Sequence, residues 1–237
     1  MIEGKTVLAI VPARSGSKGI PSKNLARVGG VSLIGRAGDV LSRVPWIDRK
    51  VLSTDSAEYA EEGSAHGLDA PFLRPEALSH DRAGALETIV HALETCERLD
   101  GRRYDLIVLT EPTSPLRQPD DVESTVRSVL DTGADSAMTV SAVDTKYHPE
   151  KVFRVNDGTL KFYVSAGQAV TQRQQLEPLY SRNGLCYCFR RETLMAKKAL
   201  ITENSIPVIT RRPVANIDEP LDLLWAEFLL ANAGKGI

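Results

Sequence analysis

Short apolar runs alternate with helical patterns over the first 143 residues of the chain. Apolar runs of strand length, rich in β-branched residues, predict strands at 7–11, 51–53, 71–73, 106–109 and 137–143. Between them, apolar residues recur at helical spacing and predict helices over 33–44, 55–65, 84–99 and 120–133. This alternation predicts a mostly parallel sheet with helices on both faces.

Two of these helices start with specific polar signals. Ser32 is expected to cap the helix that Pro45 ends, because its hydroxyl can accept a bond from a free backbone amide. Asp55 and Glu58 form a capping-box pattern for the helix that runs through Ala65.

The alternation breaks between residues 144 and 182. Two apolar runs, 152–155 and 160–164, flank Asn156-Asp157-Gly158, which predicts a β-hairpin. The earlier pattern then resumes with a strand, a helix, a strand and a final helix, at 185–189, 191–197, 206–209 and 221–232. The predicted fold class is therefore α/β: one Rossmann-like, three-layer domain over 1–237, with an inserted β-rich subdomain at 144–182.

The composition is that of a globular protein with one sizeable core: 237 residues, 42% hydrophobic and 25% charged. A net charge of −2 argues against binding to nucleic acid. No apolar run has the length of a membrane span and the N-terminus lacks a signal-peptide core, so we expect a cytoplasmic protein without a membrane partner. The three cysteines give no disulfide framework, and Cys186 and Cys188 are expected to pack in the core.

After the first apolar run the chain becomes basic and rich in glycine. Pro12 is expected to end the strand, and a mixture of cations and glycines follows: Arg14, Gly16, Lys18, Gly19, Lys23 and Arg27. Glycines let backbone amides turn toward an anion and the cations supply charge, so this loop predicts a phosphate site; an ordinary polar turn is the alternative. It is neither GxGxxG, because Lys18 stands where a glycine is needed, nor a Walker A loop.

The order of residues in the loop is more specific than its composition. Residues 12–24 read Pro-Ala-Arg-x-x-Ser-Lys-Gly-x-Pro-x-Lys-Asn. Further motifs follow along the chain: Ser53-Thr54-Asp55, Leu73-Arg74-Pro75, Pro112-Thr113-Ser114-Pro115-Leu116-Arg117, Arg173-Gln174-Gln175, Asn183-Gly184 and Ile217-Asp218. Over nearly the whole chain this series resembles the CMP-N-acylneuraminate (sialic acid) synthetases, which are acylneuraminate cytidylyltransferases. The resemblance implies an enzyme that activates sialic acids and related nine-carbon acids.

This resemblance implies a nucleotide site made of the basic loop and two residues beyond it: Arg14, Ser17, Lys18, Lys23, Asn24, Arg74 and Ala83. Arg74 is expected to read the acceptor edge of cytosine with its guanidinium; without the resemblance, it is equally well a surface arginine. Lys23, together with Arg14 and Asp218, is the implied catalytic group, and it would stabilise charge on the α-phosphoryl group.

Asp218 is also the implied metal ligand, with Asn216 beside it, for Mg²⁺ or for Mn²⁺ in its place. The best-known members of the family have a second aspartate where this chain has Asn216, whose amide carries no charge. From the residues alone, Asp218 has another interpretation, as the cap of the helix that starts at Pro220. The two roles are compatible.

The sugar acid is expected to contact four residues: Glu111, Ser114, Lys151 and Arg173. The resemblance implies a homodimer with shared active sites, in which Arg173 of the inserted subdomain meets the substrate carboxylate in the neighbouring subunit. Lys151 is a second candidate for that cation, and solvated surface charges are the alternative for both. Glu111 replaces the glutamine of many relatives, and a carboxylate facing an acidic sugar is unfavourable unless a cation or donors meet it.

The expected partners are thus CTP and a nine-carbon 2-keto acid. The expected reaction joins CMP to the anomeric hydroxyl of a sialic-type acid and releases pyrophosphate. Two alternatives stay open: the same chemistry on legionaminic, pseudaminic or a deoxyoctulosonic acid, and a non-catalytic nucleotide-binding relative.

Overall fold

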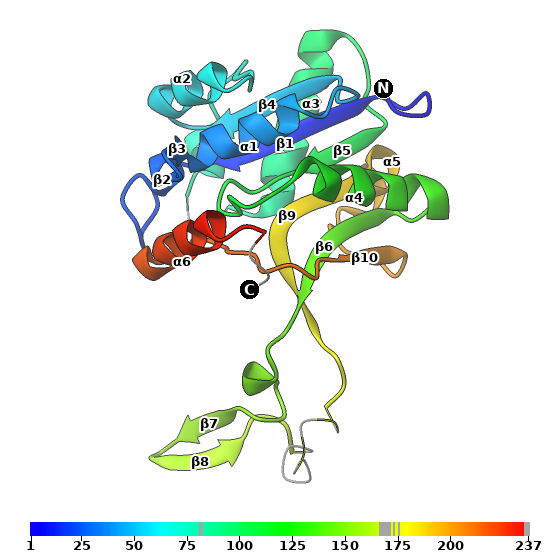
Figure 1. Cartoon of the computed structure of the whole chain (residues 1–237). Coiled ribbons are helices and arrows are strands. Elements are labelled where there is room, and N and C mark those ends of the chain that lie inside the picture. The colour runs from blue at the N-terminus through cyan, green and yellow to red at the C-terminus, as the bar shows by residue number, and fades with distance from the viewer. Residues whose placement is uncertain (81–82, 166–171, 173, 175, 235–237) are drawn as a thin grey trace.

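A central sheet organises the part of the chain that the computed structural model describes, which is residues 1–80, 83–165, 172, 174 and 176–234 (Figure 1). Within those residues six strands pair in the order β10-β6-β9-β5-β1-β4. Their bounds are β1 Val7–Ala13, β4 Arg49–Thr54, β5 Leu106–Leu109, β6 Ser136–Ala142, β9 Tyr180–Arg190 and β10 Ser205–Ile209. Neighbours run parallel except β9, which is antiparallel to β5 and β6. The predicted α/β fold with a mostly parallel sheet is confirmed.

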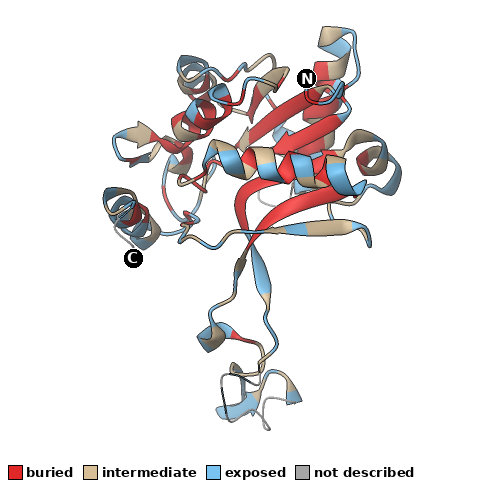
Figure 2. Cartoon of the chain, turned by 45° about the vertical axis from the view of Figure 1, so that its right-hand side comes forward, coloured by how far each residue is buried: buried red, intermediate tan, exposed pale blue. Residues whose placement is uncertain are grey.

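Helices cover both faces of this sheet. They are α1 Leu33–Ser42, α2 Ala57–Ala65, α3 Ala85–Asp100, α4 Pro119–Thr132, α5 Arg191–Lys197 and α6 Pro220–Ala231. Successive residues of a strand point to opposite faces, so β1 contributes Val7, Ala9 and Val11 to a core shared with α1 and α4. Leu8 and Ile10 pack in the other core, with α3 and α5. Figure 2 shows that the buried residues concentrate in the sheet between these layers.

The remaining helix, α6, lies beside the basic loop because a third core cluster holds it there. Ala226 and Leu229 of α6 pack with Val28 and Ile217. Val28 belongs to a short hairpin of β2 Arg27–Val28 and β3 Val31–Ser32. The described residues also include the 3-10 turns η1 Lys23–Leu25, η2 Glu76–Leu78 and η3 Thr145–Tyr147. No helix among the described residues is both long enough and apolar enough to cross a membrane.

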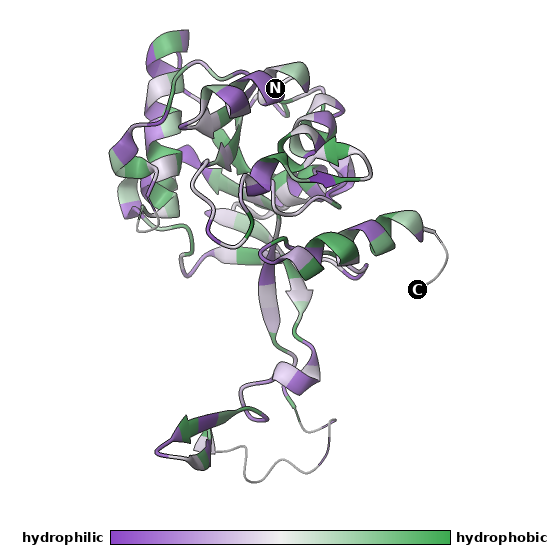
Figure 3. Ribbon diagram, turned by 90° about the vertical axis from the view of Figure 1, so that its left-hand side faces the viewer, coloured by the Kyte–Doolittle hydropathy of each residue, from purple (hydrophilic) through white to green (hydrophobic). Residues whose placement is uncertain are grey.

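Between β6 and β9 the chain leaves the sheet and forms a projection, which we call the arm (the described residues of 143–179; Figures 1 and 3). At its far end, β7 Phe153–Asn156 and β8 Thr159–Phe162 form an antiparallel hairpin. Asp157 and Gly158 between them have φ values of 48° and 74°, the left-handed conformation that a two-residue hairpin turn requires. The predicted hairpin is confirmed.

Several predicted boundaries agree closely with the structure. The strand 106–109 and the helix 191–197 begin and end at the predicted residues. Ser32 caps α1, since its hydroxyl accepts a hydrogen bond from the amide of Gly35 at 2.8 Å. The three cysteines, Cys96, Cys186 and Cys188, are buried and not disulfide-bonded, as expected for core residues.

Three expectations about strands and helix caps were wrong. Pro12 does not end β1, which pairs with β4 through Ala13. The backbone nitrogen of Pro12 faces β5 rather than β4, and β5 has already ended at Leu109. The missing donor of Pro12 therefore breaks no hydrogen bond of the sheet. Residues 71–73 form a single bridge between Thr54 and Leu73 rather than a strand. Pro71, the first residue of this segment, and Pro75, two residues after it, lack the backbone donors that a longer ladder would need.

The third correction concerns Asp55. Ser56, not Asp55, is the N-cap of α2, and its hydroxyl accepts a hydrogen bond from the amide of Tyr59 at 3.4 Å. The carboxylate of Asp55 turns instead toward the basic loop and bonds Ser15. Because Asp55 was predicted to cap α2, its contact with Ser15 of the basic loop was not predicted.

Candidate active site

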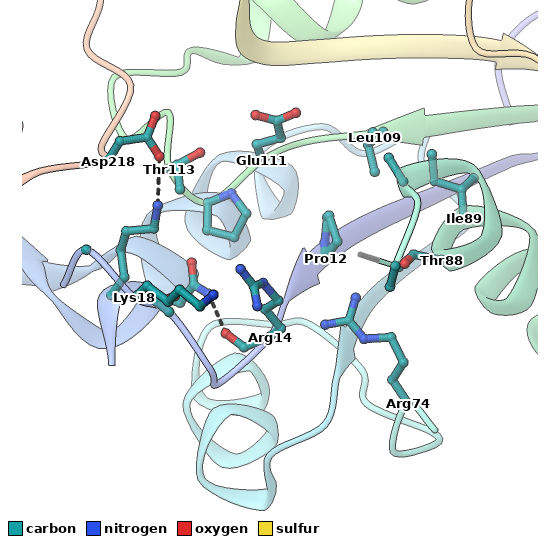
Figure 4. Close-up of a pocket in the computed structure, with 17 residues that line it drawn as sticks. Pro12, Arg14, Lys18, Arg74, Thr88, Ile89, Leu109, Glu111, Thr113 and Asp218 are labelled. Atoms are coloured by element: carbon teal, nitrogen blue, oxygen red, sulfur yellow. Dashed lines mark hydrogen bonds and ion pairs between the residues drawn. The ribbon is translucent and has the colours of Figure 1, made fainter. Parts of the chain in front are cut away.

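A cavity of about 460 Å³ opens at the carboxyl ends of β1 and β5 (Figure 4). This is the edge of a parallel sheet at which ligands bind in α/β proteins. The basic loop, Arg74, α3, the segment after β5 and the segment before α6 all contribute side chains. The walls are formed by Pro12, Arg14, Ser17, Lys18, Gly19, Lys23, Asn24, Arg74, Ala83, Ala85, Thr88, Ile89, Leu109, Glu111, Pro112, Thr113 and Asp218.

The predicted nucleotide residues all line this cavity, as do Glu111 and Asp218. Three other predicted residues that the structure describes, Ser114, Asn216 and Lys151, do not. Ser114 is buried behind the wall, where its hydroxyl donates to the carbonyl of Asn183 at 2.7 Å. Asn216 is exposed outside the cavity, Lys151 belongs to the arm, and Arg173 lies outside the described residues.

The basic loop has a fixed shape that follows from hydrogen bonds to its backbone. The buried amide of Asn24 donates to the carbonyl of Arg14 at 3.1 Å, and thereby joins the two ends of the loop. Within the loop, the amide of Ser17 donates to the carbonyl of Ser15 at 2.9 Å. Gly19 lies so close to the segment before α6 that a Cβ there would be 2.5 Å from the carbonyl oxygen of Asp218. A glycine is therefore needed where these two segments meet.

Lys23 reaches from the loop to this same segment. Its Nζ donates to the carbonyl of Ile217 and to Oδ1 of Asp218, each at 2.9 Å. The lysine side chain is 17% exposed and that of Asp218 is 73% exposed, so the ion pair at the cavity wall is open to solvent on the side of Asp218. The backbone of Ile217 is held in turn by a hydrogen bond to the carbonyl of Thr113 at 2.8 Å.

Asp218 does not cap α6. Glu219 is the N-cap, and it forms a capping box with Asp222. The carboxylate of Asp218 is thus turned to the cavity, where a cation already faces it. Among the described residues no group of three His, Cys, Asp or Glu side chains could enclose a metal by itself. A single carboxylate nevertheless fits Mg²⁺, which binds through one or two carboxylates together with substrate phosphates and water.

Arg74 forms the opposite end of the cavity. Its backbone amide donates to the carbonyl of Thr54 at 2.6 Å, and the residue is only 6% exposed. Burial lowers the pKa of its guanidinium. Two of its nitrogens, Nε and Nη2, are buried without a hydrogen-bond partner in the described structure. Buried donors without partners are costly, so they mark a place where a ligand with acceptor atoms would bind.

Another part of the site lies where the end of β5 meets β9. Gly184 has φ of 72°, and a Cβ on it would be 2.4 Å from Oγ of Ser114 and 2.7 Å from Oε2 of Glu111. Burial, and then the charge of the nearby Glu111 carboxylate, raise the pKa of Tyr187. The guanidinium of the buried Arg117 donates its hydrogen bonds to the backbone carbonyls of Glu111, Gly184 and Leu185, and its charge acts on the Glu111 carboxylate only through space.

Sequence reasoning missed some residues of the site. Thr88 and Ile89 line the cavity but belong to no motif, and only the packing of α3 against β1 places them there. Thr113 also lines the cavity; it belongs to the motif at 112–117, but no role was predicted for it. Tyr187 reads as a core residue in an apolar strand, and the tertiary contact with Glu111 gives it a polar partner. The Asp55 contact described above was assigned to a helix cap.

The fold and this cavity, with a cationic glycine loop at one end and a buried arginine fork at the other, define a nucleotide-binding α/β enzyme of the nucleotidyltransferase class. A family model described as "Cytidylyltransferase" matches residues 8–214, and the chain belongs to this family.

Named relatives agree with this assignment. The chain is 28% identical over 228 residues to the CMP-N,N'-diacetyllegionaminic acid synthase of Legionella pneumophila, and the match covers 93% of each protein. It is 29% identical over 200 residues to the N-acylneuraminate cytidylyltransferase of Streptococcus agalactiae, covering 84% of this chain and 46% of that longer protein.

Among solved structures, the CMP:2-keto-3-deoxy-manno-octonic acid synthetase complexed with CTP superposes with a TM-score of 0.70. The superposition covers 96% of this chain and 99% of the other at 18% sequence identity. At that identity the likeness shows a shared fold.

Proposed function

We propose that this enzyme joins CMP from CTP to the anomeric hydroxyl of a sialic-type nonulosonic acid and releases pyrophosphate. One observation carries the proposal: a single cavity has partnerless buried donors of Arg74 at one end and the Lys23–Asp218 pair at the other. A cytosine has ring acceptors for such donors, and a triphosphate extending from it would meet the basic loop.

In the reaction, the anomeric oxygen forms a bond to the α-phosphorus while the bond between that phosphorus and the bridging oxygen to the β-phosphorus breaks. Pyrophosphate leaves with the electron pair, and the hydroxyl proton passes to solvent or a base. Lys23 is close enough to the mouth of the cavity to contact the α-phosphoryl oxygens, where its ammonium would stabilise the charge of the transition state. Arg14 and Lys18 would neutralise the rest of the phosphate chain.

We assign the metal contact to Asp218, because its carboxylate is exposed, faces the cavity and needs no second protein ligand for Mg²⁺. Bound Mg²⁺, or Mn²⁺, would offset phosphate charge. Asn216 is a weaker candidate, since it does not line the cavity.

The acceptor is proposed to lie beside Glu111. The Glu111 carboxylate lies near Tyr187 at the cavity wall, and its oxygens can accept hydrogen bonds from a hydroxyl or amide of the sugar. The relatives make N-acetylneuraminic acid and N,N'-diacetyllegionaminic acid the first acceptors to test. N,N'-diacetyllegionaminic acid carries two amide N–H donors, which suit the acceptor-only carboxylate of Glu111 better than the glutamine that many relatives have at this position.

We further propose a homodimer in which the arm of one subunit completes the site of the other. The arm extends beyond its own body and exposes apolar side chains, namely those of Phe153, Val155, Leu160 and Tyr163 (Figure 3). In this arrangement Arg173 would supply the cation for the substrate carboxylate. A cytoplasmic location completes the proposal, because the reaction consumes CTP.

The decisive measurement is pyrophosphate release from CTP, ATP, GTP and UTP with a panel of nonulosonic and deoxyoctulosonic acids. We expect release only with CTP, a divalent cation and one preferred acid, with a CMP-sugar detected by mass. Equal turnover with ATP would contradict the cytidylyl assignment. Binding of CTP without release for any acid would instead favour the non-catalytic alternative.

The crossed arrangement has its own test. Chains carrying Lys23→Ala and chains carrying Arg173→Ala should each be poorly active, whereas mixed dimers regain one intact site and part of the activity. Mixed dimers that form, as shown by two affinity tags, yet stay inactive would reject the shared site.

A further inference from the structure

Asp55 lies at the carboxyl end of β4, next to the basic loop but outside the cavity wall. Both of its carboxylate oxygens are used by one residue of that loop. Oδ1 accepts the backbone amide of Ser15 at 2.8 Å, and Oδ2 accepts the hydroxyl of Ser15 at 2.9 Å. Such bonds to a charged acceptor are stronger than ordinary hydrogen bonds, and two of them fix the orientation of Ser15.

Ser15 is the point at which this support matters most. β1 ends at Ala13, so the ladder no longer holds the chain there. Arg14, directly before Ser15, and Ser17, two residues after it, both line the cavity. Because the Ser17 amide donates to the carbonyl of Ser15, fixing Ser15 fixes the start of the turn that presents both residues.

The same carboxylate also acts on Arg74. Asp55 follows Thr54, whose carbonyl accepts the amide of Arg74. Burial lowers the pKa of the Arg74 guanidinium. The negative charge of Asp55 raises this pKa, and the positive charge of Arg14 lowers it further. Asp55 therefore attracts Arg74, whereas Arg14 repels it. Figure 4 shows the guanidinium groups of Arg14 and Arg74 near each other on the same side of the cavity. The negative charge of Asp55 offsets this repulsion at Arg74 before any phosphate is bound.

We propose that Asp55 is a positioning residue that sets the spacing between the phosphate loop and the base reader, and so sets nucleotide affinity without touching the nucleotide. The proposal deepens the proposed function and rests on it for the identity of the nucleotide. It separates Asp55 from a purely structural carboxylate, because it predicts an effect on the binding of one substrate rather than on the amount of folded enzyme.

The test is titration calorimetry of CTP, without sugar, on the full chain. Asp55→Ala removes both hydrogen bonds and the charge, and we expect its Kd to rise about tenfold to a hundredfold, the scale of one to two bonds to a charged group. Asp55→Asn keeps an acceptor for the Ser15 amide but loses the charge, so an intermediate value is expected. Ser15→Ala, which removes one bond and keeps the charge, should also be intermediate.

Ser56→Ala is the matched control. It removes one side-chain hydrogen bond at the residue next to Asp55, and that bond only caps α2. Its Kd should equal that of the wild type. In steady state, Asp55→Asn should raise the KM for CTP and leave kcat within about threefold. A loss of kcat with unchanged KM, which a smaller folded fraction would produce, overturns the proposal.

Equal Kd values for Asp55→Ala and Ser56→Ala would overturn it as well. Running the same series with inorganic tripolyphosphate and with ATP separates this failure from that of the proposed function. If the wild type binds one of these and not CTP, the nucleotide assignment is wrong, and the effect of Asp55 is then read from the ligand that binds.

Discussion

The body of the molecule and the arm use apolar residues in opposite ways, although β6 and β9 connect them. Inside the sheet, Ala137 and Cys186 of these strands are fully buried. Most described residues of the arm are exposed or half-buried, and Phe153 and Leu160 of the hairpin are 51% and 69% exposed. The body therefore supplies the free energy of folding and positions the cavity, whereas the arm offers apolar surface that folding of one chain does not bury.

The largest expected effect tests the body. Ile10→Ala deletes a fully buried side chain in the core between β1 and α3, and should lower the free energy of unfolding by about 2–5 kcal/mol because it leaves a cavity. Urea unfolding followed by circular dichroism measures the loss. A change as small as that of a surface substitution would mean that this core is not what stabilises the body.

The next effect concerns chemistry in the body. Lys23→Ala should lower kcat about 10²-fold or more, the scale of losing one preorganised donor in a transition state, with a smaller effect on CTP binding. Lys5→Ala is the control, because that lysine forms an exposed ion pair with Asp105 away from the cavity. A rise confined to the KM for CTP would make Lys23 a ground-state phosphate ligand instead.

The third effect lies where the two regions meet, since β9 carries Tyr187 from the arm side into the site. Glu111→Gln should shift preference among acids toward N-acetylneuraminic acid, by about tenfold to a hundredfold in kcat/KM, the range for one hydrogen bond to a charged group. Competition between paired acids, resolved by mass spectrometry of the CMP-sugars, measures the shift. Glu123→Gln on the exposed face of α4 is the control. An unchanged ranking of acids removes Glu111 from the specificity determinants.

The smallest expected effect tests the arm. Leu160 is 69% exposed, so Leu160→Ala should change the free energy of unfolding by no more than about 0.5 kcal/mol under dilute conditions. If the arm packs on a second subunit, the same variant should weaken association in analytical ultracentrifugation. A loss of stability as large as that of Ile10→Ala, at concentrations where the chain is monomeric, would contradict the contrast drawn between the regions.

Periodic apolar patterns were sufficient to predict most of the sheet and its helices. They predicted the strand correctly at Leu106–Leu109, where every residue is buried. They failed at residues 71–73, where the prolines allow only one β-bridge. The residues of the first loop were predicted to lie together, and they do line one cavity. The contacts of Asp55 and Tyr187 could not be predicted, because each depends on a partner from another strand that no spacing reveals.

The burial of the three cysteines makes the chain convenient to label. Burial raises the pKa of the Cys96 thiol to about 11 and that of Cys186 to about 12, so in neutral buffer neither presents a reactive thiolate. None of them lines the cavity or belongs to the arm. A single cysteine introduced on the hairpin, for example by Lys161→Cys, would therefore react with a maleimide dye long before the native thiols. The position of the arm could then be followed by fluorescence in an otherwise unaltered enzyme.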